Sequence, residues 1–338
     1  MAKRVAVTGG AGFLGSNLCL HLLRMGDHVT CFDNFSSGSV SNIEDLLDHP
    51  RFRLVEHDIT VPFEADVEQI YNLACPASPA HYQTDPIHTV KTNVDGAINV
   101  LEVARAAGAR ALQASTSEVY GEPACHPQEE SYRGDVNPLG PRACYVEGKR
   151  CAETLFAGYG ERYGVSIRIA RIFNTYGPRM LPEDGRVVSN FVVSALAGAP
   201  LHVYGDGRQT RSFCYVDDMV RGLVALMDYP DGIAGPVNLG NPQEVTIAEL
   251  AQQVVRACGS GSSIRFAPRP MDDPTRRCPS IARAQSVLDW RPSVSLEEGL
   301  PRTIGYFRSL VSRPLEARGD GLCSPAPCPP SSAAVSRD

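Results

Sequence analysis

Short apolar runs alternate with longer amphipathic segments along the first half of the chain. We predict buried strands at the apolar runs 4–8, 28–33, 52–57, 69–74, 110–115 and 165–173. Between them, apolar residues recur at helical spacing, which predicts helices from after Gly15 to about Met25, over 87–107 and over 144–163. Strands that alternate with helices indicate an α/β fold, with a doubly wound parallel sheet joined by right-handed crossovers.

The pattern becomes less regular after about residue 174. There we predict strands at 201–204 and near 236–239, and helices near 217–228 and at 246–258. We therefore divide the chain into a first domain over 1–175, to which a segment near 210–235 returns, and a smaller C-terminal α/β lobe over 176–313. Residues 314–338 are rich in Pro, Ser and Ala and poor in large apolar residues, which predicts a disordered tail.

Composition narrows the possible functions. The chain has 338 residues, 43% of them hydrophobic, and a net charge of −6, which suits a globular protein and disfavours nucleic-acid binding. No apolar run approaches the ~18 residues that span a bilayer, and the start of the chain shows no signal-peptide pattern. Its 11 cysteines are scattered without a CxxC pair, so we expect reduced thiols, no metal site and a cytoplasmic location.

A glycine-rich turn follows the first predicted strand. Gly9, Gly12 and Gly15 have dinucleotide-binding spacing, with Phe13 and Leu14 between the last two, and a predicted helix begins there. Asp33 ends the next strand, where a carboxylate accepts hydrogen bonds from the adenine ribose and disfavours a 2′-phosphate. This combination predicts a Rossmann-like domain that binds NAD rather than NADP. Asp58, after the third strand, suits either a contact with adenine or a solvated loop.

Tyr145 and Lys149 form the candidate catalytic pair. Their spacing of four places both side chains on one helical face, and a nearby ammonium lowers the pKa of a phenol, so Tyr145 is a candidate base. Only three of the 32 basic residues are lysines, namely Lys3, Lys91 and Lys149. Lys91 lies near the start of a predicted helix, where a cation gains nothing from the helix dipole, so we expect it to bind a phosphate or a carboxylate.

Thr116, Ser117 and Glu118 directly follow the fifth predicted strand. Ligands of open α/β sheets bind beyond the carboxyl ends of the strands, so these residues should face the cofactor. A hydroxyl there can share a hydrogen bond with Tyr145, although Ser117 suits a plain turn equally well. Glu118 is a candidate acid, base or water-orienting group.

The glycine turn, Asp33, Thr116, Tyr145 and Lys149 together resemble the extended short-chain dehydrogenase/reductase family, which includes the NAD-dependent epimerases and dehydratases. Within it, long stretches resemble the UDP-glucuronate decarboxylases, or UDP-xylose synthases. The resemblance covers roughly residues 1–311, and its most specific segments are 74–93, 114–130, 136–150, 171–180, 184–191, 204–218, 237–244 and 272–281.

The resemblance implies a reaction and a role for each catalytic residue. Tyr145 takes the proton and NAD the hydride from C4 of UDP-glucuronate, the 4-keto acid loses carbon dioxide, and the hydride returns to give UDP-xylose. Thr116 and Ser117 lie near the reacting hydroxyl or carboxylate, Glu118 serves the carboxylate step or protonation at C5, and Arg277 binds the carboxylate or the developing oxyanion.

The resemblance also implies two sets of binding residues. Besides the glycine turn, Asp33, Asp58, Tyr145 and Lys149, the cofactor set contains Asn34, Ser37, Gly38, Ile59, Leu73, Ala74 and Thr92. Besides Arg277, the substrate set contains Pro76, Ser78, Tyr82, Lys91, Asn174, Arg179, Val188, Tyr204, Gln209 and Arg211. Of these, Asn174 and Arg211 are expected at the UDP phosphates with Arg179 nearby, and Pro76, Ser78 and Tyr82 at the C6 end of the sugar.

Several alternatives stay open. Ser280 stands where many relatives have Asp, and this variant also resembles decarboxylases that stop at UDP-4-keto-pentose. A nucleotide-sugar 4,6-dehydratase, a 4-epimerase and a non-catalytic NAD sensor share much of the pattern, although an epimerase needs no group for the sugar carboxylate. The resemblance further implies a homodimer through helices 87–107 and 144–163. Its expected apolar stripe contains Val94, Ile98, Leu101, Leu155 and Phe156.

Overall fold

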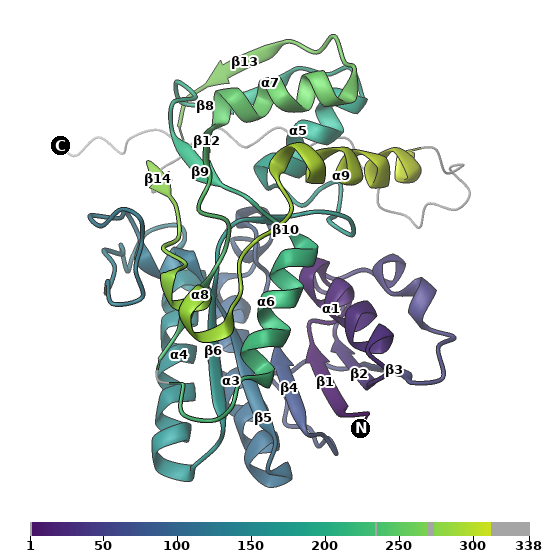
Figure 1. Ribbon diagram of the computed structural model, residues 1–338, viewed down its shortest axis with the longest axis vertical. Coiled ribbons are helices and arrows are strands. Elements are labelled where there is room, and N and C mark those ends of the chain that lie inside the picture. The colour runs from purple at the N-terminus through teal and green to yellow at the C-terminus, as the bar shows by residue number, and fades with distance from the viewer. Residues whose placement is uncertain (1, 234, 270–273, 312–338) are drawn as a thin grey trace, which may run out of the picture.

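A computed structural model of the chain describes residues 2–233, 235–269 and 274–311. Its centre is a seven-stranded, fully parallel sheet with the strand order β11-β6-β5-β4-β1-β2-β3 (Figure 1). The strands are β1 Arg4–Thr8, β2 His28–Asp33, β3 Phe52–Glu56, β4 Gln69–Asn72, β5 Arg110–Thr116, β6 Ile167–Ile172 and β11 Val237–Leu239. The order reverses at β1, so the predicted Rossmann-like α/β fold is confirmed.

Successive residues of the central strands point into two different cores. On β1, Val5 and Val7 pack on one side of the sheet, while Ala6 packs on the other. The first side is covered by α1 (Phe13–Arg24) and α6 (Val216–Asp228), and the second by α3 (Pro86–Ala107) and α4 (Ala143–Tyr163). Because both sides are buried, the central residues of β1 form a continuous apolar run instead of alternating with polar residues.

The caps of α3 show how the sequence sets the ends of its helices. The Asp85 side chain accepts a hydrogen bond from the backbone N–H of His88, and Pro86 occupies the first helical position. The helix ends at Gly108, whose φ of 64° lies in the left-handed region that glycine adopts without strain.

The C-terminal lobe lies beyond one end of the sheet, above it in Figure 1. Its strand β8 pairs in parallel with β13, and β12, β9 and β14 form a three-stranded sheet. The strands of the lobe are β8 Leu201–Tyr204, β9 Thr210–Ser212, β12 Glu244–Thr246, β13 Ile264–Ala267 and β14 Arg276–Arg277. Its helices are α5 Val187–Leu196, α7 Ile247–Cys258 and α9 Leu296–Val311.

The chain crosses between the two parts several times. After β9, the strand β10 (Cys214–Tyr215) pairs with β7 (Thr175–Tyr176), and α6 and β11 then rejoin the large sheet. This returning segment therefore extends to residue 239. The helix α8 (Ala282–Leu288) also packs against α6 and β11. The predicted tail over 314–338 lies outside the described residues.

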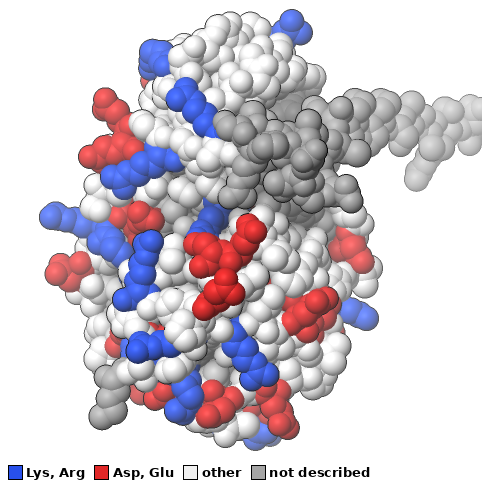
Figure 2. Space-filling view, turned by 90° about the vertical axis from the view of Figure 1, so that its right-hand side faces the viewer, with Lys and Arg blue, Asp and Glu red and all other residues white. Residues whose placement is uncertain are grey.

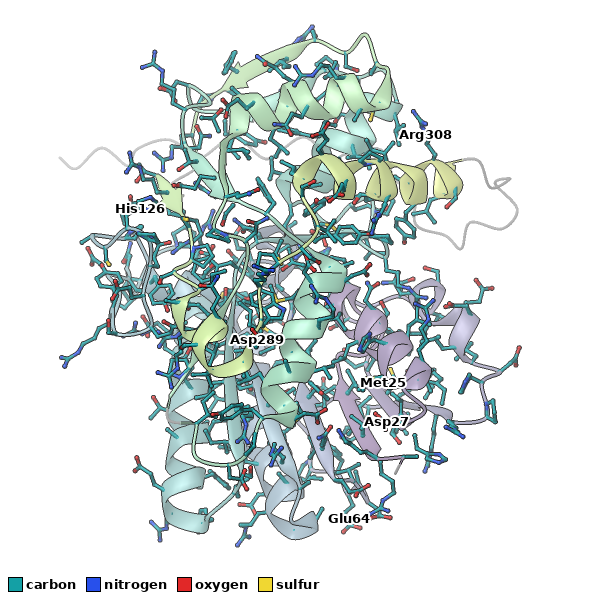
Figure 3. All side chains as sticks on the ribbon, in the orientation of Figure 1. Met25, Asp27, Glu64, His126, Asp289 and Arg308 are labelled. Atoms are coloured by element: carbon teal, nitrogen blue, oxygen red, sulfur yellow. The ribbon has the colours of Figure 1, made fainter. Side chains whose placement is uncertain are left out.

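The loop that follows β5 ties the lobe to the sheet. The backbone of Gln128 exchanges hydrogen bonds with Cys278 and Ser280, each 2.8 Å long. Nearby, the side chain of His126, which is labelled in Figure 3, has its Nε2 3.0 Å from a carboxylate oxygen of Glu244. These contacts hold β14, and with it Arg277, at a fixed place relative to β5.

Two of the five residues expected at a dimer interface belong instead to the core. Leu101 and Phe156 are fully buried against the sheet, because they lie on the inner faces of α3 and α4. The outer surface of α3 carries other apolar residues, with Ile87 68% exposed and Val90 37% exposed.

Acidic and basic side chains are interspersed on the face drawn in Figure 2. No helix in the described ranges is long and apolar enough to cross a membrane.

Two arginines of the sheet donate hydrogen bonds to backbone carbonyls at the C-terminal end of α6. Arg168 on β6 is 2% exposed and donates hydrogen bonds to the carbonyls of Ile167 (2.7 Å) and Leu226 (3.2 Å). Arg110 donates to the carbonyl of Met227 at 2.7 Å. The last carbonyls of a helix have no partner within the helix, so these two guanidinium groups satisfy the end of α6.

We expect Arg168→Met to lower the free energy of unfolding by about 3 kcal/mol, because buried carbonyls lose their donor. In thermal denaturation this corresponds to a fall in Tm of roughly 4–5 °C. Arg256→Met, at the exposed end of α7, is the control and should change stability by no more than about 0.5 kcal/mol. Equal Tm values for the two variants would show that Arg168 does not anchor α6.

Candidate active site

The glycine turn brings α1 unusually close to the strands. Gly9 has a φ of +69°, and a Cβ atom there would lie 2.8 Å from the backbone of Ala74. A Cβ atom at Gly15 would lie 2.0 Å from the carbonyl oxygen of Gly9. Only glycine fits at both positions, and the N-terminus of α1 then opens directly at the turn. This is the geometry in which a helix N-terminus receives a pyrophosphate.

Asp33 lies beside this turn at the end of β2. Its carboxylate accepts hydrogen bonds from the backbone N–H groups of Ala11 (2.9 Å) and Phe35 (2.8 Å). Burial raises the pKa of Asp33, and these two hydrogen bonds oppose the rise. A Cβ atom at Gly38 would meet the same carboxylate at 2.9 Å. Since an ionised carboxylate offers about four lone pairs, acceptor capacity remains for the hydroxyls of a ribose.

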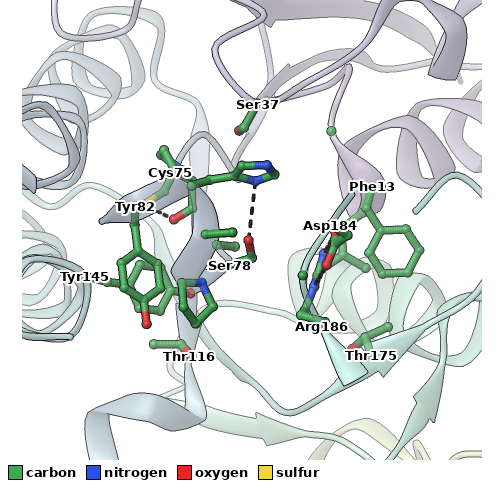
Figure 4. Close-up of a pocket in the computed structure, with 18 of the residues that line it drawn as sticks. Phe13, Ser37, Cys75, Ser78, Tyr82, Thr116, Tyr145, Thr175, Asp184 and Arg186 are labelled. Atoms are coloured by element: carbon green, nitrogen blue, oxygen red, sulfur yellow. Dashed lines mark hydrogen bonds and ion pairs between the residues drawn. The ribbon is translucent and has the colours of Figure 1, made fainter. Parts of the chain in front are cut away.

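One cavity of about 750 Å³ runs from this turn, along the carboxyl ends of the strands, to the lobe. Figure 4 shows Tyr145 and Thr116 on one side of it, and Phe13, Asp184 and Arg186 on the other. It is lined by every residue predicted from the sequence except Lys91: Gly9, Gly12, Phe13, Leu14, Gly15, Asp33, Asn34, Ser37, Gly38, Asp58, Ile59, Leu73, Ala74, Pro76, Ser78, Tyr82, Thr92, Thr116, Ser117, Glu118, Tyr145, Lys149, Asn174, Arg179, Val188, Tyr204, Gln209, Arg211 and Arg277.

Lys91 does not reach the cavity, contrary to the sequence prediction. It is exposed on the outer side of α3, whereas the next residue, Thr92, is buried and lines the cavity. Successive residues of an α-helix point about 100° apart, so only one of these two neighbours can face the site. The scarcity of lysine was therefore a misleading signal at this position.

Tyr145 and Lys149 both point into the cavity from α4. The Lys149 ammonium is buried, donates to the carbonyl of Ala114 at 2.9 Å, and lies 5.9 Å from the centroid of the Tyr145 ring. Thr116 hydrogen-bonds with the Tyr145 hydroxyl, and the Tyr82 ring stacks on Tyr145 with centroids 5.0 Å apart.

The pKa values of this pair differ from the simple expectation. Burial raises the pKa of Tyr145 well above its usual value, and only the hydrogen bond with Thr116 opposes this rise. Burial also lowers the pKa of Lys149. In the protein alone, desolvation therefore dominates the pKa of Tyr145, and the predicted lowering by Lys149 is not seen.

The other end of the cavity holds a charged cluster. Glu118 lies between two guanidinium groups, 3.2 Å from Nη1 of Arg142 and 3.9 Å from Nη2 of Arg277. Burial by itself would raise the pKa of Glu118, but Arg277 and Arg142 outweigh it and hold that pKa below its usual value. Arg277 is 2% exposed and donates to the carbonyl of Ser117 at 2.9 Å. Its buried Nε–H has no partner among the described residues.

The lobe contributes the remaining wall. Arg211 is 9% exposed and donates to the carbonyl of Thr210 at 2.9 Å. Arg179 forms an ion pair with Asp45 at 2.7 Å, so its charge is already partly neutralised. Tyr204 is 47% exposed at the rim. These residues, with Val188 and Gln209, reach the cavity only because the lobe folds back over the sheet, whereas Asn174 reaches it from the loop after β6.

Sequence reasoning missed two arginines at this site. Arg186 donates to Asp184 at 2.6 Å and lies 5.3 Å from the centroid of the Phe13 ring, within the cavity. Arg142 lines the cavity beside Glu118. Both lie in segments that carry the family resemblance, 184–191 and 136–150, and that was the signal available. In the described part of the chain, no group of three or more His, Cys, Asp or Glu residues is placed to hold a metal, and the cysteines are free thiols.

Residues 5–240 match the model of the NAD dependent epimerase/dehydratase family. The chain therefore belongs to this family, and its cofactor is NAD, which fits the glycine turn and the Asp33 carboxylate described above.

Its curated relatives include UDP-glucuronic acid decarboxylase 1 of Arabidopsis thaliana, which is 53% identical over 316 residues, or 94% of this chain and 72% of the relative. UDP-glucuronic acid decarboxylase 1 of Xenopus tropicalis is 52% identical over 97% of this chain and 76% of the relative. Among solved structures, UDP-glucuronic acid 4-epimerase from Bacillus cereus in complex with UDP-glucuronic acid and NAD is 29% identical. It has a TM-score of 0.82, over 91% of this chain and 99% of that chain.

We expect Gly15→Ala to weaken NAD binding roughly tenfold or more, because the new methyl group collides with the turn that receives the pyrophosphate. Isothermal titration with NAD measures the effect. Gly305→Ala is the control, since a Cβ atom there meets nothing within 4 Å. That change should leave NAD affinity unaltered and stabilise α9 by up to ~1 kcal/mol. Wild-type affinity in folded Gly15→Ala would contradict the proposed pyrophosphate site.

Proposed function

We propose that this protein is a UDP-glucuronate decarboxylase that oxidises C4, removes the C6 carboxylate as carbon dioxide and ends at UDP-xylose. The observation that carries the proposal is the buried Arg277, whose Nε–H has no partner among the described residues, in the same cavity as Tyr145. A buried guanidinium with an unused donor suits a carboxylate or a developing oxyanion. The decarboxylase relatives, at 52–53% identity, support the same activity.

In the first half of the reaction, Tyr145 takes the proton of the C4 hydroxyl. Thr116 holds the phenol and the sugar hydroxyl in line, and the buried Lys149, which donates to the carbonyl of Ala114, lies on the same face of α4 as Tyr145. NAD, when bound, accepts the C4 hydride and later returns it. Because the hydride returns, the complete cycle produces no net NADH.

Oxidation at C4 makes the sugar a β-keto acid. The electron pair of the C5–C6 bond then moves toward the C4 carbonyl oxygen, carbon dioxide leaves, and Tyr145 donates a proton to the enolate oxygen. Arg277 orients the carboxylate before this step, and Glu118 serves the carboxylate step or the later protonation at C5. The net change is the uptake of one proton and the release of one carbon dioxide. Asn174, which follows β6, and Arg211 on β9 of the lobe bind the UDP phosphates.

A UDP-glucuronate 4-epimerase is the second candidate. The Bacillus cereus structure shows that an epimerase of this fold can hold UDP-glucuronic acid, so the expectation that an epimerase needs no group for the carboxylate was wrong. Identity nevertheless favours a decarboxylase, at 53% against 29%. An endpoint at UDP-4-keto-pentose differs only in the final reduction and is decided by the same assay.

We expect the purified protein with UDP-glucuronate and NAD to give a product lighter by carbon dioxide, with no net absorbance of NADH. Mass spectrometry and absorbance spectroscopy measure both. In Tyr145→Phe the rate of carbon dioxide release should fall roughly 10²–10⁴-fold, because the base is lost. NADH accumulation with a 4-keto product would move the endpoint to UDP-4-keto-pentose. A product of unchanged mass with inverted C4 would show that the protein is an epimerase and not a decarboxylase. No change in UDP-glucuronate, together with loss of water from a neutral nucleotide hexose supplied in its place, would show that it is a 4,6-dehydratase.

We also propose a homodimer formed through α3 and α4. Ile87 and Val90 are exposed on α3, and Leu139, just before α4, is 94% exposed. Gln83 donates to the carbonyl of Pro141 at 3.1 Å, which places the segment before α4 beside the start of α3. Apolar side chains gathered this way favour association with a second copy.

Light scattering should give the wild-type protein twice its chain mass of 36.5 kDa. Ile87→Arg combined with Val90→Arg should give the single chain mass, because burying two charges in the interface is unfavourable. Val61→Arg, at an exposed site after β3, is the control and should stay dimeric. A monomeric wild-type protein would contradict this assembly.

A further inference from the structure

Arg142 is a charged residue of the cavity to which the reaction above gives no part. It stands directly before α4, in the turn that leads into the helix carrying Tyr145. Its side chain is 18% exposed and reaches back to Glu118, with Nη1 3.2 Å from Oε2. An arginine that only solvates a surface keeps its guanidinium in water, whereas this one is directed at a carboxylate that is itself only 25% exposed.

The two oxygens of Glu118 face two different guanidinium groups. Oε2 lies against Arg142, and Oε1 lies 3.9 Å from Nη2 of Arg277. The two arginines differ in their other contacts, because Arg277 is 2% exposed and also holds the carbonyl of Ser117. Arg142 makes the shorter contact with Glu118 and thereby fixes the direction in which the carboxylate points.

Besides Arg142 and Arg277, the charged or titratable groups that interact with Glu118 include Arg211 on β9 and Tyr145 on α4. Glu122 interacts with Arg277. Three cations thus surround one carboxylate. Burial would favour the protonated form, but the cations outweigh it, so the pKa of Glu118 stays below its usual value.

Glu118, Arg142 and Arg277 also stand between the main cavity and a second one of about 610 Å³. The second cavity is lined on its other sides by Glu122, Asp135, Val136 and Thr275, among others. Arg142 therefore forms part of the wall that separates the sugar end of the active site from this second space.

We propose that Arg142 is a positioning residue that acts through Glu118 in the decarboxylation half of the reaction. Its guanidinium holds the Glu118 carboxylate ionised and oriented toward the sugar end of the cavity. This inference rests on the proposed function. It separates the two halves of the cycle, because oxidation at C4 depends on the Tyr145 group and the carboxylate steps depend on Glu118.

A double-mutant cycle with Arg142→Met and Glu118→Gln tests the proposal. Arg142→Met should slow carbon dioxide release roughly tenfold or more in the wild-type background and less than about twofold in Glu118→Gln, because a positioning residue has no effect once its target is gone. Single-turnover formation of enzyme-bound NADH should change less than about twofold in Arg142→Met, since C4 oxidation is untouched.

The pH dependence gives a second readout that a merely structural role would not change. The acid limb of kcat should move up by about one pH unit in Arg142→Met, because removing one nearby cation raises the pKa of Glu118. Arg142→Lys keeps the positive charge and should therefore return the acid limb of kcat most of the way to its wild-type pH. Arg162→Met, exposed at the end of α4, is the matched control and should leave both rates and the pH profile unchanged.

The possible outcomes are distinguishable. Equal losses from Arg142→Met in both backgrounds, an equal loss of NADH formation, or an unmoved acid limb would each overturn the proposal. A wild-type protein that releases no carbon dioxide would instead overturn the proposed function. If Arg142→Met folds poorly in thermal denaturation, the pH profile of Arg142→Lys decides between the two roles. A marked loss of activity in folded Arg142→Lys, with an acid limb at the wild-type position, contradicts the electrostatic role.

Discussion

Because every strand of the large sheet runs in the same direction, the loops after β1, β2, β4, β5 and β6 all open at one edge. The glycine turn, Asp33, the segment after Asn72, Thr116 to Glu118 and Asn174 are far apart in the sequence and become neighbours only through this constraint. The close approach of α1 to the turn depends on it as well, since β1 and β4 must lie side by side for Gly9 to meet Ala74. The cavity is thus a consequence of the parallel register.

The lobe completes the site by supplying charge. Arg211 and Arg277 come from β9 and β14, which pair with each other in register, so both guanidinium groups arrive together. Burying them is costly unless they find partners, and Glu118 from the sheet domain is one such partner. The carboxylate end of the active site therefore forms only when the lobe is docked on the sheet. The lobe is also joined to the large sheet by the chain itself, because β10 pairs with β7 and β11 pairs with β6 after the chain leaves β9.

A strand such as β1 could be predicted because two-sided burial makes its central residues a continuous apolar run. The strands β5 and β6 also carry buried polar side chains, such as Gln113 and Arg168. Helix α5 was not predicted, since residues such as Val187, Val188, Val192 and Val193 make it apolar on most sides and leave no clear polar face. Helix α9 contains Pro301, a residue that normally argues against a helix interior. Among the site residues, Arg142 and Arg186 stayed hidden because 29 arginines in one chain give a single arginine little weight. Lys91 was misplaced because sequence spacing near a helix start does not fix which side chain faces inward.

The central claim is that one cycle removes C6 from the sugar and places a solvent proton at C5. The most direct measurement is an NMR time course with UDP-glucuronate carrying ¹³C at C6, run in deuterated water with NAD and the full-length protein. The account predicts that the label leaves the sugar entirely as carbon dioxide and bicarbonate, while UDP-xylose forms with one deuterium at C5. A label that stays in the sugar throughout, with or without inversion at C4, would contradict it.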